Sequence, residues 1–423
     1  MSRLQWLLSR LRRTLWVRVS LYALLGFAAA IAASLSSWYL PWTLPYDISF
    51  DAIDSLLTII ASSMLAVTTF SVSSLTSAYG SATANATPRA TALLAEDQFV
   101  QSVLATFIGS FLFSIVGLVA LKVSFYGPQG RAVLFAVTIG VIVLIVLALL
   151  RWIHQLTKLG RVGDTIDRLE DATRRSMQAR LDLPFLGGCP AVGNPPGSAS
   201  HPIPSRKVGY VQFVDAERLS QISEKAGAII DIRVLPGAFV YDGTPLAALR
   251  DAPADDDTPK AICDAFSIGS ARSFDQDPRF GVIALTEVAL RALSPAMNDP
   301  GTAIDVIGRH ARLLTLWAKG GDYALRQPLQ YPRVHIPALR YDDIYDDAFH
   351  LIARDAAGHI DVLIRLIKTL DALRRTGPDH ARQAADRQLR LAFDRGLAGL
   401  SSDHDRDRLR QVLEGLDRLW QVP

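Results

Sequence analysis

The stretch IDSLLTIIASSMLAVTTFSVSSLTSAY, residues 53–79, decides how this chain folds. It is long enough to cross a bilayer and carries no charge after Asp54. Hydroxyl residues recur along it at steps of three, four and seven, which places six of them on one side of a helix: Ser55, Thr58, Ser62, Thr69, Ser73 and Thr76. We call these six residues the hydroxyl stripe. In a membrane helix such a stripe indicates either contact with another helix or a surface that meets water, and both interpretations stay open.

Four apolar stretches have about the length of a bilayer crossing, at residues 19–40, 53–79, 100–121 and 132–150. They predict four transmembrane helices within residues 1–150. A cleaved signal peptide is the competing interpretation of the first stretch, because its apolar core ends in small residues. The third stretch carries small residues at helical contact spacing and is expected to pack between helices, whereas the fourth is expected to face lipid.

The charges that flank these stretches predict a sidedness. Arginines precede the first stretch, and Arg151, Lys158, Arg161 and Arg168 follow the last one. The loop after the first stretch carries acidic residues without a Lys or Arg. Since segments rich in Lys and Arg next to membrane spans stay in the cytoplasm, both termini are expected there.

The composition indicates a membrane part joined to a soluble part. Of the 423 residues 50% are hydrophobic, and the mean hydropathy is +0.21. A net charge of +3, without a gathered basic face, argues against nucleic acid as a partner. The two cysteines, Cys189 and Cys263, supply neither a disulfide framework nor a metal-ligand set.

The predicted fold is an α-helical membrane domain followed by a cytoplasmic α+β domain with a small β module and a C-terminal helical bundle. After the membrane domain of residues 1–150 we expect a helical stalk at 151–183, a Pro/Gly/Ser-rich linker at 184–207, the β module at 208–258 and a mainly helical domain at 259–423. Within these parts the pattern predicts a hairpin around Asp242-Gly243, an edge strand at 331–339, and helices at 343–373, 379–397 and 403–419.

Polar residues are densest between positions 272 and 305. The candidate ligand or regulatory residues there are Arg272, Asp275, Asp277, Arg279, Asn298 and Asp299. Oxygen-rich clusters can hold a hard cation, and paired helix starts with arginines nearby can hold an anion. The competing interpretation is structural, because Asp277 and Asp299 each precede a proline and therefore suit helix caps.

Five segments resemble a bacterial family. They are ASSMLAVTTFSVSSLTSAYGSATANATPRAT, VLATFIGSFLFSIVGLVAL, LLRWIHQLTKLGRVGDTIDRLE, PGAFVYDGTPLA and SFDQDPRFGVIALTEVALRALSPAMNDPGTAIDVIGR. Together they are similar to the bacterial membrane proteins grouped as domain of unknown function 2254. The resemblance implies an integral membrane protein and carries over no catalytic or binding residue.

Three functional hypotheses follow. The leading one is a homo-oligomeric protein of the bacterial inner membrane, with several spans, in which the hydroxyl stripe lines a channel or transport path for ions or small solutes. The second is a non-conducting scaffold or signalling protein whose soluble partner is unidentified. The third is a membrane-tethered enzyme or ligand sensor that uses the region from 272 to 305. Catalytic motifs are missing, so no enzyme activity, metal or cofactor is predicted.

Overall fold

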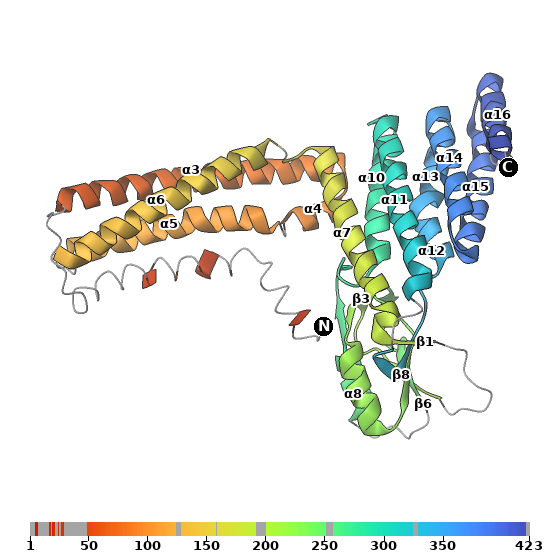
Figure 1. Cartoon of the computed structure of the whole chain (residues 1–423), viewed down its shortest axis with the longest axis horizontal. Coiled ribbons are helices and arrows are strands. Elements are labelled where there is room, and N and C mark those ends of the chain that lie inside the picture. Colours follow the sequence, from red (N-terminus) through yellow and green to blue (C-terminus); the bar gives the residue numbers. More distant parts are fainter. Residues whose placement is uncertain are drawn as a thin grey trace. The chain divides into compact units, whose positions relative to one another are not determined.

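The computed structural model describes residues 5–6, 17, 19–21, 24, 27–28, 49–95, 97–123, 128–157, 159–191, 200–250, 257–324 and 329–419. The chain forms two compact units (Figure 1). The apolar unit comprises Leu7–Ala84 and Thr91–Asp164, and the α/β unit comprises Met1–Trp6, Asn85–Ala90 and Thr165–Pro423.

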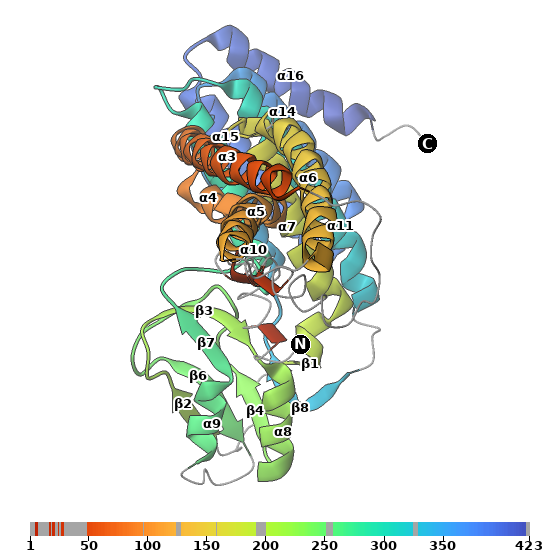
Figure 2. The same ribbon diagram turned by 90° about the vertical axis from the view of Figure 1, so that its left-hand side faces the viewer.

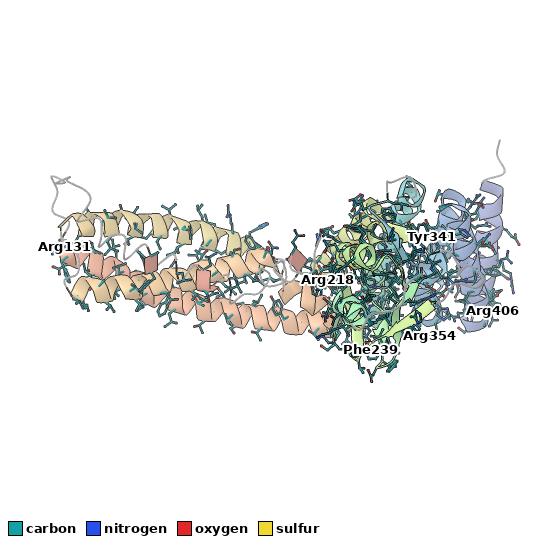
Figure 3. All side chains as sticks on the ribbon, turned by 90° about the horizontal axis from the view of Figure 1, so that it is seen from below. Arg131, Arg218, Phe239, Tyr341, Arg354 and Arg406 are labelled. Carbon is teal, nitrogen blue, oxygen red and sulfur yellow. The ribbon has the colours of Figure 1, made fainter. Side chains whose placement is uncertain are left out.

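Three helices of the apolar unit are long and apolar enough to cross a membrane. They are α3 (Phe50–Asn85), α5 (Gln98–Lys122) and α6 (Pro128–Leu156), and the short α4 (Pro88–Ala95) follows α3. They match three of the four predicted spans. The first predicted span, residues 19–40, lies mostly outside the described residues. The three long helices run side by side, with Arg131 at the end where α6 begins (Figure 3).

The interior of the apolar unit explains the different roles of its helices. In the most apolar window of α5, 56% of the residues are buried, against 22% in α6. The third stretch is therefore the packing helix, as its small residues predict. Its Gly117 leaves room for Leu57 of α3, since a Cβ there would lie 3.1 Å from the Leu57 Cδ1.

The predicted helical stalk at 151–183 is interrupted. Helix α6 ends at Leu156, and α7 begins only at Val162 and runs to Asp182. Between them Gly160 has a φ of 81°, a left-handed conformation that favours glycine. A Cβ on this glycine would lie 3.6 Å from the Cα of Ala78, so the backbone turns close against α3.

Two sheets form the β part of the α/β unit (Figure 2). The first has the order β1 (Gly188–Pro190), β8 (Tyr331–Ile336), β4 (Ile229–Ile232), β6 (Pro245–Arg250) and β2 (Ser200–Pro204). The second has the order β5 (Phe239–Val240), β3 (Gly209–Val214) and β7 (Phe266–Gly269). Strand β8 is parallel to both of its neighbours, and the other pairs are antiparallel. The helices α8 (Ala216–Ala226) and α9 (Thr258–Asp264) help to enclose the apolar core that the two sheets share.

The predicted linker at 184–207 contributes structure at both of its described ends. A 3-10 turn at Pro184–Gly187 leads into β1, and β2 closes the segment, while residues 192–199 lie outside the described residues. Both strands lie at edges of the five-stranded sheet. Prolines are tolerated there because an edge strand leaves part of its backbone unpaired.

Two strand predictions are wrong in their pairing. Strands β5 and β6 form no hairpin, because β5 pairs with β3 and β6 with β4 and β2. The intervening turn is held by Ser205, whose carbonyl accepts from Gly243 N at 2.9 Å. The predicted edge strand is β8, which instead lies between β1 and β4. Pro337 does not interfere because β8 ends at Ile336.

The rest of the α/β unit is helical. Its helices are α10 (Pro278–Leu293), α11 (Pro300–Ala324), α12 (Tyr341–Tyr345), a π turn η2 (Asp346–His350), α13 (Leu351–Asp355), α14 (Ile360–Thr376), α15 (Asp379–Gly399) and α16 (Asp403–Leu419). The predicted single helix at 343–373 is wrong. The chain leaves the helix after Asp355, and His359, whose backbone is extended, starts α14.

Candidate functional site

The hydroxyl stripe lies entirely on the outward side of α3. All six of its residues are exposed in the single chain. The opposite side of α3 packs against α5 and α6 through Ile53, Leu57, Ile60 and Met64, all buried. The stripe is therefore not used to hold the three long helices together.

Three of the stripe's hydroxyls donate hydrogen bonds within α3. The Oγ of Ser62 donates to the carbonyl of Thr58 at 2.9 Å, and the Oγ1 of Thr69 donates to that of Leu65 at 3.0 Å. Thr76 makes the same contact with Val72 at 2.9 Å. Each oxygen can still accept a hydrogen bond from outside. At these three positions the surface can thus meet either water or an apolar neighbour without leaving a donor unpaired.

The stripe is narrow and long. At 100° per residue its members fall within about 60° of the helix circumference. Large exposed apolar side chains border it, with Leu65 and Val72 on one side and Ile59 and Phe70 on the other. From Ser55 to Thr76 it extends about 32 Å, close to the thickness of the hydrocarbon core of a bilayer.

The candidate region around Arg272 begins with a closed ion pair. The Nε and Nη2 of Arg272 both lie 2.7 Å from the Oδ2 of Asp277. Asp277 is 2% exposed and caps α10 by accepting from Phe280 N. Burial raises the pKa of Asp277, and the attraction of Arg272 opposes this rise. Both groups are already partnered, so this pair is a structural cap.

Asp275 holds Trp6. Its Oδ2 accepts from the indole Nε1 of Trp6 at 2.7 Å and from the Oγ of Ser273 at 2.9 Å. The Trp6 ring stacks on Phe213 of β3, with centroids 5.2 Å apart. Asp275 therefore anchors a tryptophan that is far away in sequence.

Arg279 joins α10 to the π turn. Its Nε donates to the Oδ2 of Asp347 at 2.6 Å, and its Nη1 donates to the Oδ2 of Asp343 at 3.3 Å. Burial lowers the pKa of Arg279, but these two carboxylates outweigh burial and raise it. The guanidinium is thus committed to contacts within the protein.

Asn298 and Asp299 lie at the other end of α10. The Asp299 carboxylate accepts from the backbone N and the Oγ1 of Thr302 at 3.1 and 2.6 Å, so it starts α11 as predicted. Asn298 has a φ of 45°, which its short polar side chain tolerates. The 16 residues of α10 separate this corner from Asp277 by about 24 Å. The six candidate residues therefore do not form one site.

The described residues also contain no group of three or more His, Cys, Asp or Glu side chains placed to hold a metal ion.

A buried cluster that sequence reasoning missed joins strands β4, β6 and β8. The Nη2 of Arg250 lies 3.0 Å from both the Asp231 Oδ1 and the His335 Nδ1. Residues on neighbouring strands can be brought together only by strand order, and the sequence does not reveal that order.

Sequence reasoning also missed Arg180. It lies on the buried side of α7, in step with Ile166, Leu169 and Met177. A charged residue at an apolar position of an amphipathic helix is visible in the sequence, so this signal could have identified Arg180.

Two mycobacterial proteins are among the relatives of this chain. "Uncharacterized protein Mb1321c" of Mycobacterium bovis and "Uncharacterized protein Rv1290c" of Mycobacterium tuberculosis are each 33% identical to this chain over 120 residues. The match covers 27% of this chain and 23% of each relative, so the chain spans about a quarter of these curated proteins. No solved structure shows a significant match. The family model described as "Predicted membrane protein (DUF2254)" matches residues 12–372. Since this match covers most of the chain, the protein belongs to the DUF2254 family of predicted membrane proteins.

Proposed function

We propose that copies of this protein associate in the membrane around the hydroxyl stripe of α3, which then lines a polar path for ions or small solutes. One observation carries the proposal: the stripe occupies a side of α3 that α5 and α6 leave open, over a length of about 32 Å that matches a bilayer. A helix in a ring of subunits presents only a narrow sector to the axis and uses its flanks to contact neighbours. The bordering residues Ile59, Leu65, Phe70 and Val72 suit such flanks.

A second candidate is a non-conducting scaffold in which the stripe forms a dry seam between subunits. The hydroxyls of Ser62, Thr69 and Thr76 already donate to their own helix and need no water. Small and hydroxyl-bearing residues also allow close packing of membrane helices. Both candidates require self-association, and they differ in whether the stripe is wet.

Cysteine accessibility separates the two. In a chain with Cys189→Ser and Cys263→Ser, a cysteine replaces either Ser73 or Ser71. Ser73 belongs to the stripe, whereas Ser71 is completely buried two residues away and serves as the matched control. A charged, membrane-impermeant methanethiosulfonate should modify the cysteine at position 73 and spare the one at 71. Protection of both positions in the assembled protein favours the dry seam.

Flux through liposomes tests conduction itself. Replacing Thr58, Ser62, Thr69 and Ser73 by valine should abolish ion or solute flux, because the lining then cannot hydrate the permeant species. Thr68→Val is the control, since this threonine lies outside the stripe and donates to the Met64 carbonyl at 2.6 Å. Equal flux in the fourfold variant and the parent, or none in either, removes the support for a path.

We also propose a bacterial inner-membrane location with both termini in the cytoplasm. The support is the excess of arginine and lysine before the first and after the last apolar stretch. Cys189 and Cys263 lie in the α/β unit and are free thiols. A polyethylene-glycol maleimide should label them in inverted membrane vesicles and not in intact spheroplasts. The reverse pattern contradicts this orientation.

A further inference from the structure

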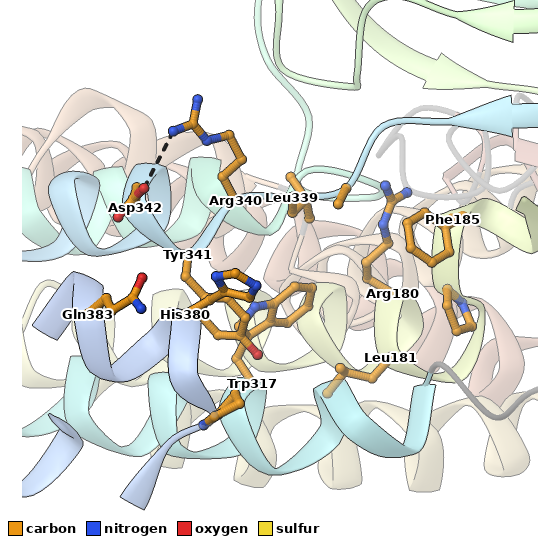
Figure 4. A pocket seen from close by; sticks show the side chains of 13 residues that line it. Arg180, Leu181, Phe185, Trp317, Leu339, Arg340, Tyr341, Asp342, His380 and Gln383 are labelled. Carbon is orange, nitrogen blue, oxygen red and sulfur yellow. Dashed lines mark hydrogen bonds and ion pairs between the residues drawn. The ribbon is translucent and has the colours of Figure 1, made fainter. Parts of the chain in front are cut away.

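A pocket of about 540 Å³ opens within the α/β unit, between the end of α7, α11, the segment that follows β8, and the start of α15 (Figure 4). Its wall includes the aromatic side chains of Phe185, Trp317 and Tyr341. Its remaining members include the apolar Leu181 and Leu339. This volume and this mixture are typical of sites for small organic molecules.

Arg180 is the unusual member of this lining. The residue is 7% exposed, and no described residue accepts a hydrogen bond from its Nη1. Burial lowers the pKa of Arg180 to about 10, although the attraction of Asp277 opposes this. A guanidinium is a strong hydrogen-bond donor, so leaving one of its nitrogens buried without an acceptor is costly.

The acidic groups nearby are engaged elsewhere. Asp277 is bound to Arg272 by two contacts of 2.7 Å. Asp342, the acidic residue of the lining, lies 2.8 Å from the Nη1 of Arg387 and 3.4 Å from the Nη2 of Arg340. Arg340 itself belongs to the lining (Figure 4). The pocket is therefore left with an excess of positive charge and an apolar wall.

The chain enters this wall in a constrained conformation. Phe185 and Leu186 have φ values of 51° and 52°, and Gly187 has a φ of 88°. Three consecutive left-handed residues, two of them not glycine, cost conformational energy. They hold Phe185 at the pocket beside Arg180 (Figure 4).

We propose that this pocket binds a small organic anion, one in which a carboxylate or phosphate-ester group is attached to an apolar or aromatic body. The anionic group pairs with Arg180, whose fork of donors matches two oxygens. The apolar body lies against Phe185 and Trp317. This site is independent of the path proposed along α3.

Fluorine NMR of the full-length protein in detergent tests the proposal. The probes are 4-fluorobenzoate and 4-fluorophenyl phosphate, and 4-fluorobenzyl alcohol is the neutral counterpart. Detergent without protein corrects for partition of each probe. We expect saturable binding, at least tenfold tighter for one or both anions than for the alcohol. The relative strength of the two anions identifies the anionic group.

Three variants complete the test. Arg180→Met keeps the side-chain bulk and should weaken anion binding at least tenfold, whereas Arg175→Met on the exposed side of α7 should leave it unchanged. Leu339→Trp fills the pocket while residue 180 stays an arginine, so it should abolish binding even if Arg180→Met misfolds. Equal binding of anion and alcohol, unchanged binding in Arg180→Met or in Leu339→Trp, or no anion binding by the parent protein overturns the proposal.

Discussion

Glu170 is the carboxylate on which the junction of α7 and α11 depends. It is 4% exposed. Its oxygens accept from the Nε and Nη2 of Arg312 at 2.9 and 2.7 Å, from the Nη1 of Arg309 at 3.0 Å and from the Nη2 of Arg174 at 2.7 Å. One buried negative charge thus serves three guanidinium groups, two of them on α11.

Glu170→Gln removes this charge at nearly constant volume. Breaking a buried ion pair costs about 3–5 kcal/mol when it strands its partner. Here the side chains of Arg312 and Arg174 are 53% and 44% exposed and can return to water. Arg309 keeps its contacts with Asp167 and Asp305. We therefore expect a loss of about 2 kcal/mol in the free energy of unfolding, which corresponds to a fall of roughly 4–8 °C in the midpoint.

The effect should depend on pH. Burial raises the pKa of Glu170, but Arg312, Arg309 and Arg174 outweigh burial and lower it below its ordinary value of 4.5. A carboxyl with a lowered folded-state pKa stabilises the fold fully above its unfolded pKa and loses this contribution as pH falls through the folded value. The parent and Glu170→Gln should therefore differ at neutral pH and converge in acid.

Thermal unfolding of the full chain in detergent, followed by tryptophan fluorescence from pH 7 downwards, measures both effects. Asp171→Asn is the matched control, because Asp171 is the exposed neighbour of Glu170 on the same helix. A midpoint for Glu170→Gln equal to that of Asp171→Asn at pH 7 refutes the reasoning. So does a difference between Glu170→Gln and the parent that stays constant into acid.

Gly281→Ala should destabilise the fold by about 1–3 kcal/mol, because the added Cβ would lie 2.0 Å from a threonine Oγ1 of α7. Gly308→Ala, where a Cβ meets open space, should be neutral or stabilising. The midpoint of thermal unfolding of each variant tests both expectations. His310 is fully buried, and burial lowers its pKa to about 3, so stability should fall as pH drops below 6.5, by up to about 1.4 kcal/mol per unit. His310→Gln should flatten this fall in unfolding scans taken against pH. Glu287 accepts hydrogen bonds from Thr87 and Arg89, where α3 gives way to α4. Glu287→Leu should therefore speed the exchange of backbone amide hydrogens in this segment, and Arg291→Leu should not.

Local signals in the sequence predicted the features that depend on close neighbours. The starts of α10 and α11 follow Asp277 and Asp299, and each of these carboxylates accepts from a backbone N–H three residues on. The three described spans follow from apolar length alone. These features need no knowledge of the tertiary structure, because the groups that determine them lie within one helical turn or one continuous run.

Pairing between distant segments is where sequence reasoning failed. The turn after β5 looks like a hairpin because Asp242-Gly243 suits a tight turn. Its geometry depends on Ser205, which lies in a segment predicted to be a linker. Likewise the residues from Arg272 to Asp299 are close in sequence, but a straight helix keeps their two ends apart. Closeness in sequence therefore does not bring these residues together in one ligand site.

Two charges on the buried side of α7 show what tertiary structure adds to the search for a site. Glu170 and Arg180 both interrupt an apolar helix face, so the sequence marks them alike. Glu170 has three arginine partners, which explains its burial by structure alone. Arg180 leaves its Nη1 without an acceptor among the described residues and lines a pocket. Because burying a guanidinium nitrogen without an acceptor costs free energy, this difference supports a ligand site at Arg180 and not at Glu170.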